Sequence, residues 1–377
     1  MNSESGRRIY EQLGVKPLIN AAGNQTVLGG SRLSPNVQQA MTEANRYYVD
    51  MKELLQRSGE VIADLLDAPA ALVTSGCAAA ITLGTAAILS GNDPEKIERL
   101  PNVTGIKHEV LIQKRQRYKY DRCVTLAGAK LIEVGDESGT TPDQLGAAFS
   151  SDTAAILYPA PGGGEGMLPL EEVIDLGNQH GVPVIVDAAM QIYPLEKMKR
   201  YAQMGAGVVG FGAKYFGGPN STGLLCGRAD LVETALLHSF IGFETSPYRT
   251  LGRPLKLDRQ EVVAVVVALR EWFEMDHETR FAEHLRKAEV IRQALDNLPH
   301  VTAAPYADEQ GLYVGLSLTL DEKAMGRSAE EIVKALGEGS PGITLYYSAN
   351  VIQVNASPLS DGDEQVVAER LQALLRS

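Results

Sequence analysis

The sequence predicts an α/β protein with a mostly parallel sheet in a large domain, followed by a smaller α+β C-terminal domain. Short apolar strands alternate with helical segments over roughly the first 250 residues. These strands are almost continuously apolar, as expected for strands that helices cover on both faces. Beyond Pro254 the alternation gives way to one long helical segment and then to strands with short helices. The length of 377 residues also exceeds what one hydrophobic core usually serves, so we expect two domains.

Changes in composition along the chain predict where the domains begin. Residues 1–35 should form an N-terminal arm and loop, because Lys16 to Pro35 is too rich in glycine, asparagine and serine for a helix and too apolar for a tail. Residues 36–250 should form the large α/β domain. Residues 251–377 should form the small α+β domain.

The large domain should begin with a helix and a first strand–turn–helix unit. Ser34-Pro35 marks the helix start, since proline is favoured in the first turn, and the amphipathic pattern continues to about Leu66. A short apolar strand over residues 71–74 follows, then a Ser75-Gly76 turn and an alanine-rich helix that ends near Gly91.

The clearest unit spans residues 154–189. It contains an apolar strand, a glycine-rich loop, a helix from Leu170 to His180, a stop at Gly181 and a second apolar strand over residues 182–186. This order predicts a βαβ crossover between parallel strands.

The remaining elements complete the two domains. Apolar segments at residues 207–213 and 222–227 predict two more short strands, one on each side of Lys214. A single long helix is expected over about residues 258–297. Strands with short helices should follow it and form the small domain.

Composition and charge exclude several classes of protein. With 35 Lys and Arg against 47 Asp and Glu, the net charge of -12 should repel nucleic acid. No apolar run is long enough for a membrane span, and the start of the chain lacks the apolar core of a signal peptide, so we expect a cytoplasmic protein. Cys77, Cys123 and Cys226 match neither a disulfide framework nor a CxxC metal site. The six histidines show no HExxH-like pairing, and we therefore expect no metal.

Two candidate binding features stand directly after predicted strands, where open α/β sheets bind their ligands. Ser75-Gly76-Cys77 leads into a helix, whose free N–H groups and dipole suit a phosphate, although small residues at such a turn often serve packing alone. Asp187 follows the strand at residues 182–186, although an aspartate there can also cap the next turn.

Lys214 is the third candidate and changes the interpretation of the other two. It follows a glycine-rich apolar strand, where burial would lower its pKa toward the range in which the amine is nucleophilic, although a lone lysine is usually a surface residue. A helix N-terminus for a phosphate, a carboxylate for a ring nitrogen and a lysine for an aldehyde are the groups that pyridoxal 5'-phosphate requires. The competing class is a non-enzymatic nucleotide-binding or regulatory module, which would not need Lys214.

Five segments carry a resemblance to a known family. They are INAAGNQTVLGGS (Ile19 to Ser31), TSGCAAA (Thr74 to Ala80), AGAKLIEVG (Ala127 to Gly135), VPVIVDAA (Val182 to Ala189) and GAKYFGGPNSTGLLCGR (Gly212 to Arg228). In these segments the chain resembles the fold-type I pyridoxal-phosphate enzymes with their transferase fold. Within them it is most similar to the branch of selenocysteine synthase and D-glucosaminate-6-phosphate ammonia-lyase.

The resemblance implies roles for the residues of the large domain. Lys214 would be the Schiff-base lysine, Asp187 the partner of the pyridine nitrogen, and Ser75, Gly76 and Cys77 the holders of the phosphate. Ala189 would pack under the ring. His108 would stack on the open face of the cofactor, although the alternative is a solvated histidine.

The resemblance also implies a set of more peripheral contacts. The Thr222 hydroxyl would reach a phosphate, often that of the neighbouring subunit, and Asn20 would lie near the active site. Arg253 and Lys256 are candidates for binding an anionic substrate group, although cations before a long helix are often merely solvated. The C-terminal strand lacks the arginine with which many members hold an α-carboxylate and offers tyrosines at residues 346–347 instead.

The expected reaction is α,β-elimination from a hydroxylated amino acid or amino sugar acid, such as a phosphorylated D-glucosaminate, to a 2-keto acid and ammonia. The resemblance favours this lyase, while a racemase or epimerase and a β-substitution enzyme remain alternatives. Selenocysteine synthase has an extra N-terminal RNA-binding region and basic surfaces. The net charge of this chain is -12, which does not suit RNA binding. Aminoacyl-tRNA is therefore a poor candidate substrate. Active sites of this fold take residues from a neighbouring subunit, so we expect a homodimer or higher homo-oligomer.

Overall fold

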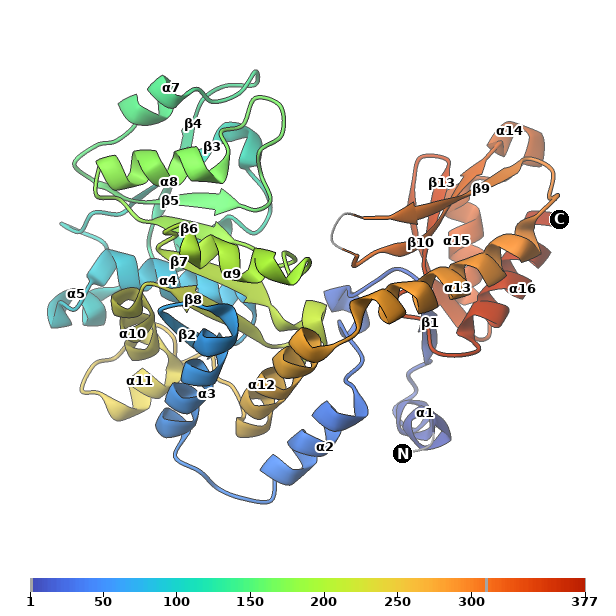
Figure 1. Ribbon diagram of the computed structural model, residues 1–377, viewed down its shortest axis with the longest axis horizontal. Coiled ribbons are helices and arrows are strands. Elements are labelled where there is room, and N and C mark those ends of the chain that lie inside the picture. The colour runs from blue at the N-terminus through green and yellow to red at the C-terminus, as the bar shows by residue number, and fades with distance from the viewer. Residues whose placement is uncertain (1–2, 309–310, 377) are drawn as a thin grey trace. The chain divides into compact units, whose positions relative to one another are not determined.

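The computed structural model describes residues 3–308 and 311–376 and divides into two compact units. The larger unit is Ser31–Glu274, and the smaller unit combines Met1–Gly30 with Met275–Ser377. Each unit has its own sheet (Figure 1).

The larger unit is built on a seven-stranded sheet with the order β2-β8-β7-β6-β5-β3-β4. The strands are β2 (Ala70–Thr74), β3 (Glu109–Gln113), β4 (Lys130–Val134), β5 (Thr153–Pro159), β6 (Val184–Asp187), β7 (Val208–Gly212) and β8 (Gly223–Gly227). Strands β7, β6, β5, β3 and β4 are mutually parallel, whereas β8 runs antiparallel to both β7 and β2. The predicted α/β class with a mostly parallel sheet is confirmed.

Helices cover both faces of this sheet. Gly84 of helix α4 (Cys77–Ser90) faces Val208, and Gly177 of helix α8 (Leu170–Gln179) faces Val184. Val208 pairs with Ile185, so the neighbouring Val184 points to the opposite face of the sheet. The α4 and α8 helices therefore lie on opposite faces, which explains why the strands between them are continuously apolar.

The other helices of the larger unit lie around this core. They are α2 (Pro35–Ala44), α3 (Met51–Leu66), α5 (Pro94–Arg99), η2 (Lys114–Gln116), α6 (Arg122–Leu126), α7 (Pro142–Ala147), α9 (Leu195–Gln203), η3 (Ala213–Phe216), α10 (Ala229–His238), α11 (Phe240–Thr245) and α12 (Arg259–Glu274).

Two helices expected to be continuous are each divided in two. The first becomes α2 and α3, and the Asp50 side chain caps α3 by accepting from the backbone N–H groups of Lys52 and Glu53. The expected helix over 258–297 becomes α12 and α13 (His277–Leu295), and Asp276 caps α13 by accepting from the Thr279 N–H at 3.1 Å. An aspartate that caps a helix has extended backbone, so no helix continues through it.

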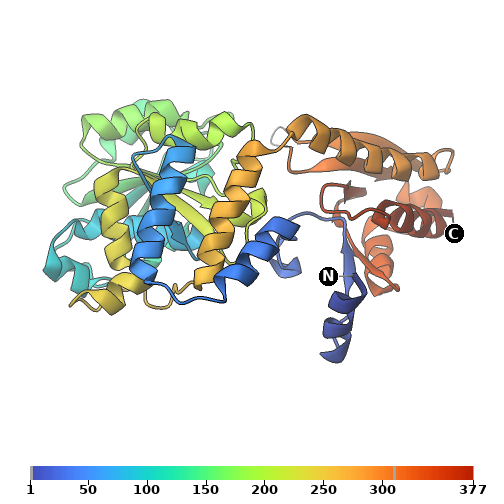
Figure 2. The same ribbon diagram turned by 60° about the horizontal axis from the view of Figure 1, so that its bottom comes forward.

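The α12 helix packs against α2 and α3, side by side with them in Figure 2. The larger unit therefore extends to Glu274, beyond the boundary that composition predicts near residue 250. Its packing against α2 and α3 holds the helix in the larger unit, a preference that composition does not reveal.

The smaller unit contains a four-stranded antiparallel sheet with the order β12-β13-β10-β9 and a two-stranded parallel pair, β1 with β11. Its elements are α1 (Ser3–Gln12), β1 (Leu18–Asn20), η1 (Thr26–Leu28), α13, β9 (Val301–Ala307), β10 (Val314–Leu320), α14 (Glu322–Met325), α15 (Ala329–Glu338), β11 (Gly342–Thr344), β12 (Tyr346–Ser348), β13 (Val351–Asn355) and α16 (Asp363–Arg376). Alternate residues of β10 and β13, such as Leu316, Leu318 and Ile352, enter its core. Strand β1 pairs with β11, and the N-terminal segment therefore belongs to this unit.

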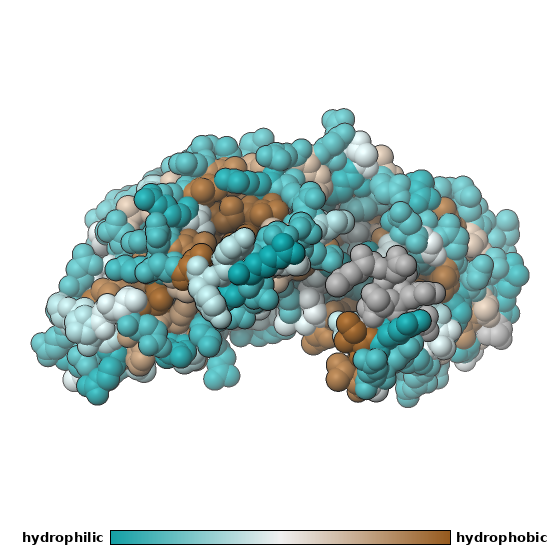
Figure 3. Space-filling model, turned by 90° about the horizontal axis from the view of Figure 1, so that it is seen from below, coloured by the Kyte–Doolittle hydropathy of each residue, from teal (hydrophilic) through white to brown (hydrophobic). Residues whose placement is uncertain are grey.

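Among residues 3–308 and 311–376, no helix combines the length and the apolar character needed to cross a membrane. The face shown in Figure 3 is mostly hydrophilic, with apolar side chains gathered in separate patches. Scattered apolar patches of this kind are normal on a folded protein.

Candidate active site

The segments that follow three strands meet at one edge of the large sheet. Asp187 ends β6 and pairs with Gly210 of the parallel strand β7. Gly212 ends β7 and pairs with Gly223 of β8, which in turn pairs with Thr74 at the end of β2. The topology therefore brings the turn after Thr74, the Asp187 carboxylate and the segment after Gly212 to the same carboxyl edge.

Asp187 is half-buried and accepts hydrogen bonds from three donors. Its Oδ1 accepts from the Cys77 thiol at 3.4 Å and from the Ala189 N–H at 3.1 Å, and its Oδ2 accepts from the Tyr118 hydroxyl. These three hydrogen bonds hold both oxygens of the carboxylate in place. The bond to Ala189 is the local bond expected if Asp187 only capped the next turn. The other two donors come from distant segments of the chain.

Lys214 lies in η3, directly beyond β7, and is half-buried. Burial lowers the pKa of Lys214 below the ordinary value of a lysine. Its Nζ lies 5.0 Å from the centre of the Tyr215 ring. The amine therefore becomes neutral, and nucleophilic, at lower pH than the amine of an exposed lysine.

The turn before α4 leaves room for an anion. Gly76 is the N-cap of α4 with φ +90°, and a Cβ added there would meet only the Ser221 carbonyl oxygen, at 3.8 Å. Within the described part of the chain, no side chain caps the first turn of α4. Its N–H groups are therefore open to a bound anion, which the helix dipole would also favour.

Close packing fixes the position of this turn relative to β8. A Cβ on Gly223 would lie 2.5 Å from the Gly76 carbonyl carbon and 2.6 Å from the Cys77 nitrogen. The Ser75 hydroxyl donates to the Leu255 carbonyl at 3.2 Å. Glycine at residue 223 is therefore required for the backbone of α4 to begin where it does.

Thr222 and Ala189 lie next to these groups with their polar atoms already engaged. The Thr222 side chain is buried and its hydroxyl donates to the Pro219 carbonyl at 2.8 Å. The Ala189 carbonyl accepts from the Gly212 N–H at 3.0 Å, which joins the segment after β6 to the end of β7. Both residues therefore shape the carboxyl edge.

The structure does not bring His108 to this site. His108 precedes β3, and the next residue, Glu109, pairs with Thr153 at the start of the parallel strand β5. It therefore lies at the amino edge of the sheet, where its Nδ1 is 2.8 Å from the Ile106 carbonyl oxygen. The expectation that His108 follows a strand has to be corrected, because the strand begins after this residue and not before it.

Tyr118 is a site residue that the sequence interpretation missed. It comes from the connection between β3 and α6, at the carboxyl edge, and its hydroxyl reaches Asp187. Correct placement of β3 at residues 109–113 would have directed attention to the aromatic residues that follow it.

Arg253 and Lys256 lie in the segment that leads to α12. The Arg253 guanidinium pairs with Glu244 at 2.6 Å, and both side chains are about half exposed. Lys256 is exposed and follows Leu255, whose carbonyl binds Ser75. This segment therefore lies beside the turn before α4, and Lys256 is next in sequence to the residue that binds the turn.

Three other residues of interest belong to the smaller unit. The Asn20 amide donates to the Gly23 carbonyl at 2.9 Å, and its oxygen accepts from the N–H groups of Ala22 and Gly23. These bonds give Asn20 a structural role in its own loop. Tyr346 and Tyr347 lie on β12 and are exposed.

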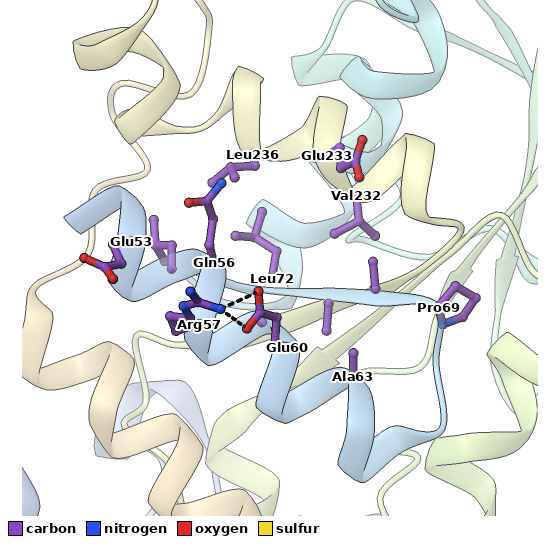
Figure 4. Close-up of a pocket in the computed structure, with 14 residues that line it drawn as sticks. Glu53, Gln56, Arg57, Glu60, Ala63, Pro69, Leu72, Val232, Glu233 and Leu236 are labelled. Carbon is purple, nitrogen blue, oxygen red and sulfur yellow. Dashed lines mark hydrogen bonds and ion pairs between the residues drawn. The ribbon is translucent and has the colours of Figure 1, made fainter. Parts of the chain in front are cut away.

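A separate cavity of the larger unit lies between α3, β2 and α10 (Figure 4). Its polar lining includes Glu53, Glu233 and the ion pair of Arg57 with Glu60 at 2.9 Å. None of the predicted site residues lines it. Among the described residues, no cluster of three histidine, cysteine, aspartate or glutamate side chains could hold a metal ion.

The residues at the carboxyl edge fit pyridoxal phosphate. The open turn at Gly76 suits a phosphate, the Asp187 carboxylate suits a protonated ring nitrogen, and the Lys214 amine suits an aldehyde. These three groups come from three strand ends of one sheet. This juxtaposition is what the chemistry of the cofactor needs.

Comparison with characterised proteins gives several relatives, and some of them span nearly the whole chain. A 5'-C-glycyluridine monooxygenase-decarboxylase from a Streptomyces species is 32% identical over 97% of this chain and 92% of its own length. D-glucosaminate-6-phosphate ammonia lyase from Salmonella typhimurium is 26% identical over 97% of both chains. An L-seryl-tRNA(Sec) selenium transferase from Geotalea daltonii is 26% identical over 61% of this chain and 53% of its own length. No family model matches the chain.

Solved structures show the same fold. The structure of D-glucosaminate-6-phosphate ammonia-lyase superimposes with a TM-score of 0.84, at 24% identity, over 97% of this chain and 98% of that chain. An aspartate aminotransferase from Thermotoga maritima has a TM-score of 0.55 at 14% identity, covering 99% of this chain and 96% of that chain. A serine palmitoyltransferase from Sphingomonas wittichii has a TM-score of 0.59 at 14% identity, covering 95% of this chain and 87% of that chain. The expected aminotransferase-like fold is confirmed.

Proposed function

The chain belongs to the selenocysteine synthase-like and D-glucosaminate-6-phosphate ammonia-lyase branch of the fold-type I pyridoxal-phosphate enzymes, and on this premise we propose that it is a pyridoxal-phosphate-dependent ammonia-lyase. Its substrate would be a hydroxylated amino acid or amino sugar acid, related to the substrate in the name of the Salmonella relative. The observation that carries the proposal is the meeting of Lys214, Asp187 and the open turn at Gly76 at one sheet edge.

Each part of the cofactor has a matching group on this chain. Lys214 would hold its aldehyde carbon, and Asp187 would hold a proton on its ring nitrogen. The backbone of Ser75, Gly76 and Cys77 would hold its phosphate, supported by the N-terminal dipole of α4. Ala189 and Thr222 support the proposal as residues that line the same edge.

When bound, pyridoxal phosphate supplies a ring that accepts the electron pair left behind at Cα of the substrate. The Lys214 Nζ, once the substrate amine has taken its place, would remove the proton from Cα as the base. Its lowered pKa suits this task, because a neutral amine is available at lower pH. The Asp187 carboxylate would accept a hydrogen bond from the protonated ring nitrogen.

The overall reaction balances without an oxidant. Cα loses a proton and Cβ loses its hydroxyl group, which together leave as water. A second water molecule then hydrolyses the carbon–nitrogen bond of the unsaturated product, so the net products are a 2-keto acid and ammonia. Returning the proton to the other face of Cα would instead give racemisation, and adding a nucleophile at Cβ would give substitution.

A second candidate function is an oxidative decarboxylation of an amino acid. The Streptomyces monooxygenase-decarboxylase supports it, since it is more similar to this chain, at 32% identity, than the ammonia lyase at 26%. Both reactions begin at Cα of an amino acid and would use Lys214 and Asp187 in the same positions. They differ in their products and in their need for dioxygen.

We further propose a homodimer or higher homo-oligomer in the cytoplasm, acting on a small molecule and not on nucleic acid. The net charge of -12 supports the last point, because an acidic surface repels a phosphate backbone. Arg253 and Lys256 are the proposed contacts for an anionic substrate group. Lys256 has the stronger support, since Arg253 already pairs with Glu244.

Cofactor uptake tests the first part of the proposal. The purified protein should absorb visible light after incubation with pyridoxal phosphate, and borohydride should fix the cofactor to one peptide that contains Lys214. Lys214→Ala should lose this labelling, whereas Lys52→Ala, at an exposed position of α3, should retain it. Wild-type protein that takes up no cofactor would contradict the proposal.

The products decide between the candidate reactions. The enzyme should be incubated with phosphorylated D-glucosaminate, serine, threonine and simple amino acids, with and without dioxygen. Ammonia and a 2-keto acid formed equally well without dioxygen would support the lyase. Carbon dioxide release that stops when dioxygen is removed would support the oxidative decarboxylation, and inversion at Cα without ammonia would support a racemase.

A further inference from the structure

We propose that Tyr118 is a positioning residue that fixes the Asp187 carboxylate and reduces the negative potential that this carboxylate exerts on the cofactor. The inference rests on the proposed function, since it assigns a task at the ring-nitrogen end of the same site. Its basis is the hydrogen bond from the Tyr118 hydroxyl to Asp187 Oδ2, which joins the connection after β3 to the end of β6.

A buried acidic residue holds the segment that delivers Tyr118. Asp121 is only 2% exposed, and its Oδ2 accepts from the Arg117 guanidinium at 2.5 Å and from the Tyr118 N–H at 3.3 Å. The ring of Tyr118 meets the ring of Tyr120 edge-on, with centres 6.0 Å apart. The backbone and the ring of Tyr118 are therefore both held, and its hydroxyl is aimed at Asp187.

The phenol is the donor in this bond. Burial and the adjacent charge of Asp187 raise the pKa of Tyr118 well above its ordinary value, so the hydroxyl keeps its proton and donates a hydrogen bond to the carboxylate at neutral pH. The opposite oxygen of Asp187 already accepts from Cys77 and Ala189. The carboxylate is thus held on both oxygens, by Tyr118 on one side and by the start of α4 on the other.

This arrangement has an electrostatic consequence with a definite sign. The hydroxyl presents the positive end of its dipole to Asp187 and thereby reduces the negative potential around the carboxylate. Removing the hydroxyl while keeping the ring should make the potential more negative. Any positive charge on the bound cofactor, including a proton on the nitrogen that joins it to Lys214, would then be retained to higher pH.

The test compares Tyr118→Phe with Tyr120→Phe in the cofactor-loaded protein. Both variants remove one hydroxyl from the same segment, but only Tyr118 bonds to Asp187, while Tyr120 is exposed. The measured quantity is the pH midpoint at which the visible absorption of the bound cofactor changes. Tyr118→Phe should raise this midpoint by roughly half a unit to one unit, and Tyr120→Phe should leave it at the wild-type value.

A graded substitution gives a second, independent readout. Placing 3-fluorotyrosine at position 118 keeps the hydroxyl but makes it a more acidic, stronger donor, so the midpoint should move in the opposite direction, to lower pH. A residue that only fills space would give no such pair of opposite shifts. The fluorinated variant also retains the hydrogen bond, which guards against a loss of folding in Tyr118→Phe.

The outcomes separate this inference from the proposed function. If wild-type protein takes up no cofactor, the proposed function fails and this inference fails with it. If the cofactor binds and both Tyr118 variants keep the wild-type midpoint, the proposed function stands and the role of Tyr118 is overturned. A midpoint that falls in Tyr118→Phe would likewise overturn the role, because it has the wrong sign.

Discussion

Partial burial makes Lys214 a weaker base than an exposed lysine, and this affects stability as well as chemistry. In the unfolded chain its pKa returns to the ordinary value of 10.5, so between the two pKa values the unfolded state binds more protons than the folded state. The free energy of unfolding of the cofactor-free protein should therefore rise with pH through this window. Below the window the buried charge lowers stability by a constant amount.

Lys214→Met should flatten this rise. Urea unfolding of cofactor-free wild-type and variant protein at about pH 8 and about pH 10 measures it, and the difference between the two proteins should shrink as the pH increases. Lys52→Met is the matched control, because Lys52 is exposed and its removal should not change the slope. An unchanged slope in Lys214→Met would mean that folding does not shift the proton affinity of this amine.

The same residue should be indispensable for chemistry at Cα. Lys214→Ala should lose the exchange of the α-proton in heavy water together with the elimination, by at least about a thousandfold, because its Nζ is the proposed base. Proton exchange can be followed by nuclear magnetic resonance with cofactor added in excess. Exchange that persists in the variant would assign the proton transfer to another residue and leave Lys214 as an anchor only.

The sequence predicts site residues well where strand ends are easily placed. Asp187 and Lys214 follow long apolar runs, so their positions at the carboxyl edge could be inferred before the structure. His108 and Tyr118 flank the short strand β3, whose limits the sequence leaves ambiguous. Placing this strand before His108 assigned His108 to the carboxyl edge of the sheet, whereas Tyr118 is the residue that lies there. Hydrogen bonds between distant segments, such as Tyr118 to Asp187, have no sequence periodicity and could not be predicted.

At the scale of elements, the contact between β8 and the start of α4 fixes the position of the turn at Gly76. Gly223 leaves no room for a side chain, since a Cβ would lie within 2.6 Å of the backbone of both Cys77 and Phe211. Such backbone cannot yield as a flexible side chain would. The added methyl group must push the first turn of α4 away from β8.

Gly223→Ala should therefore lower the free energy of unfolding by about 1 to 3 kcal/mol and weaken the affinity for pyridoxal phosphate at least about tenfold. Gly146→Ala in α7 is the control, because its Cβ meets nothing within 4 Å and helix propensity should make it neutral or slightly stabilising. Thermal unfolding and cofactor titration measure the two effects. A Gly223→Ala protein with wild-type affinity would show that the turn at Gly76 does not hold the phosphate.

The sequence did not reveal that two of its helical stretches are broken. The α12 and α13 pair and the α2 and α3 pair each read as one amphipathic stretch, because residues on either side of the break keep a helical pattern. The capping bonds of Asp50 and Asp276 decide the break, and an aspartate in a polar stretch has many other uses. The βαβ unit at residues 154–189 was predictable because glycine and a change of period mark both of its ends.

At the scale of the whole molecule, several apolar side chains lie on the surface in groups. Tyr47, Tyr48 and Val49 stand together between α2 and α3, and Tyr48 is 95% exposed. Arg259 holds this loop by stacking on the Tyr48 ring at 5.1 Å and by donating to the Asn45 carbonyl at 3.1 Å. A fixed loop that exposes three consecutive large side chains is a feature that association of subunits would cover.

We expect the chain to assemble into a dimer or a larger homo-oligomer. Light scattering should give a mass of at least 81.2 kDa, twice the 40.6 kDa of one chain, under conditions of activity. Tyr48→Glu should weaken the association at least about tenfold, because it would bury an unpaired charge, whereas Leu126→Glu, at another exposed apolar position, should not. If the assembly also completes the active site, dilution of Tyr48→Glu below its dissociation constant should lower the specific activity in parallel with the mass. A monomer of 40.6 kDa with full activity would show that one chain alone carries the complete site.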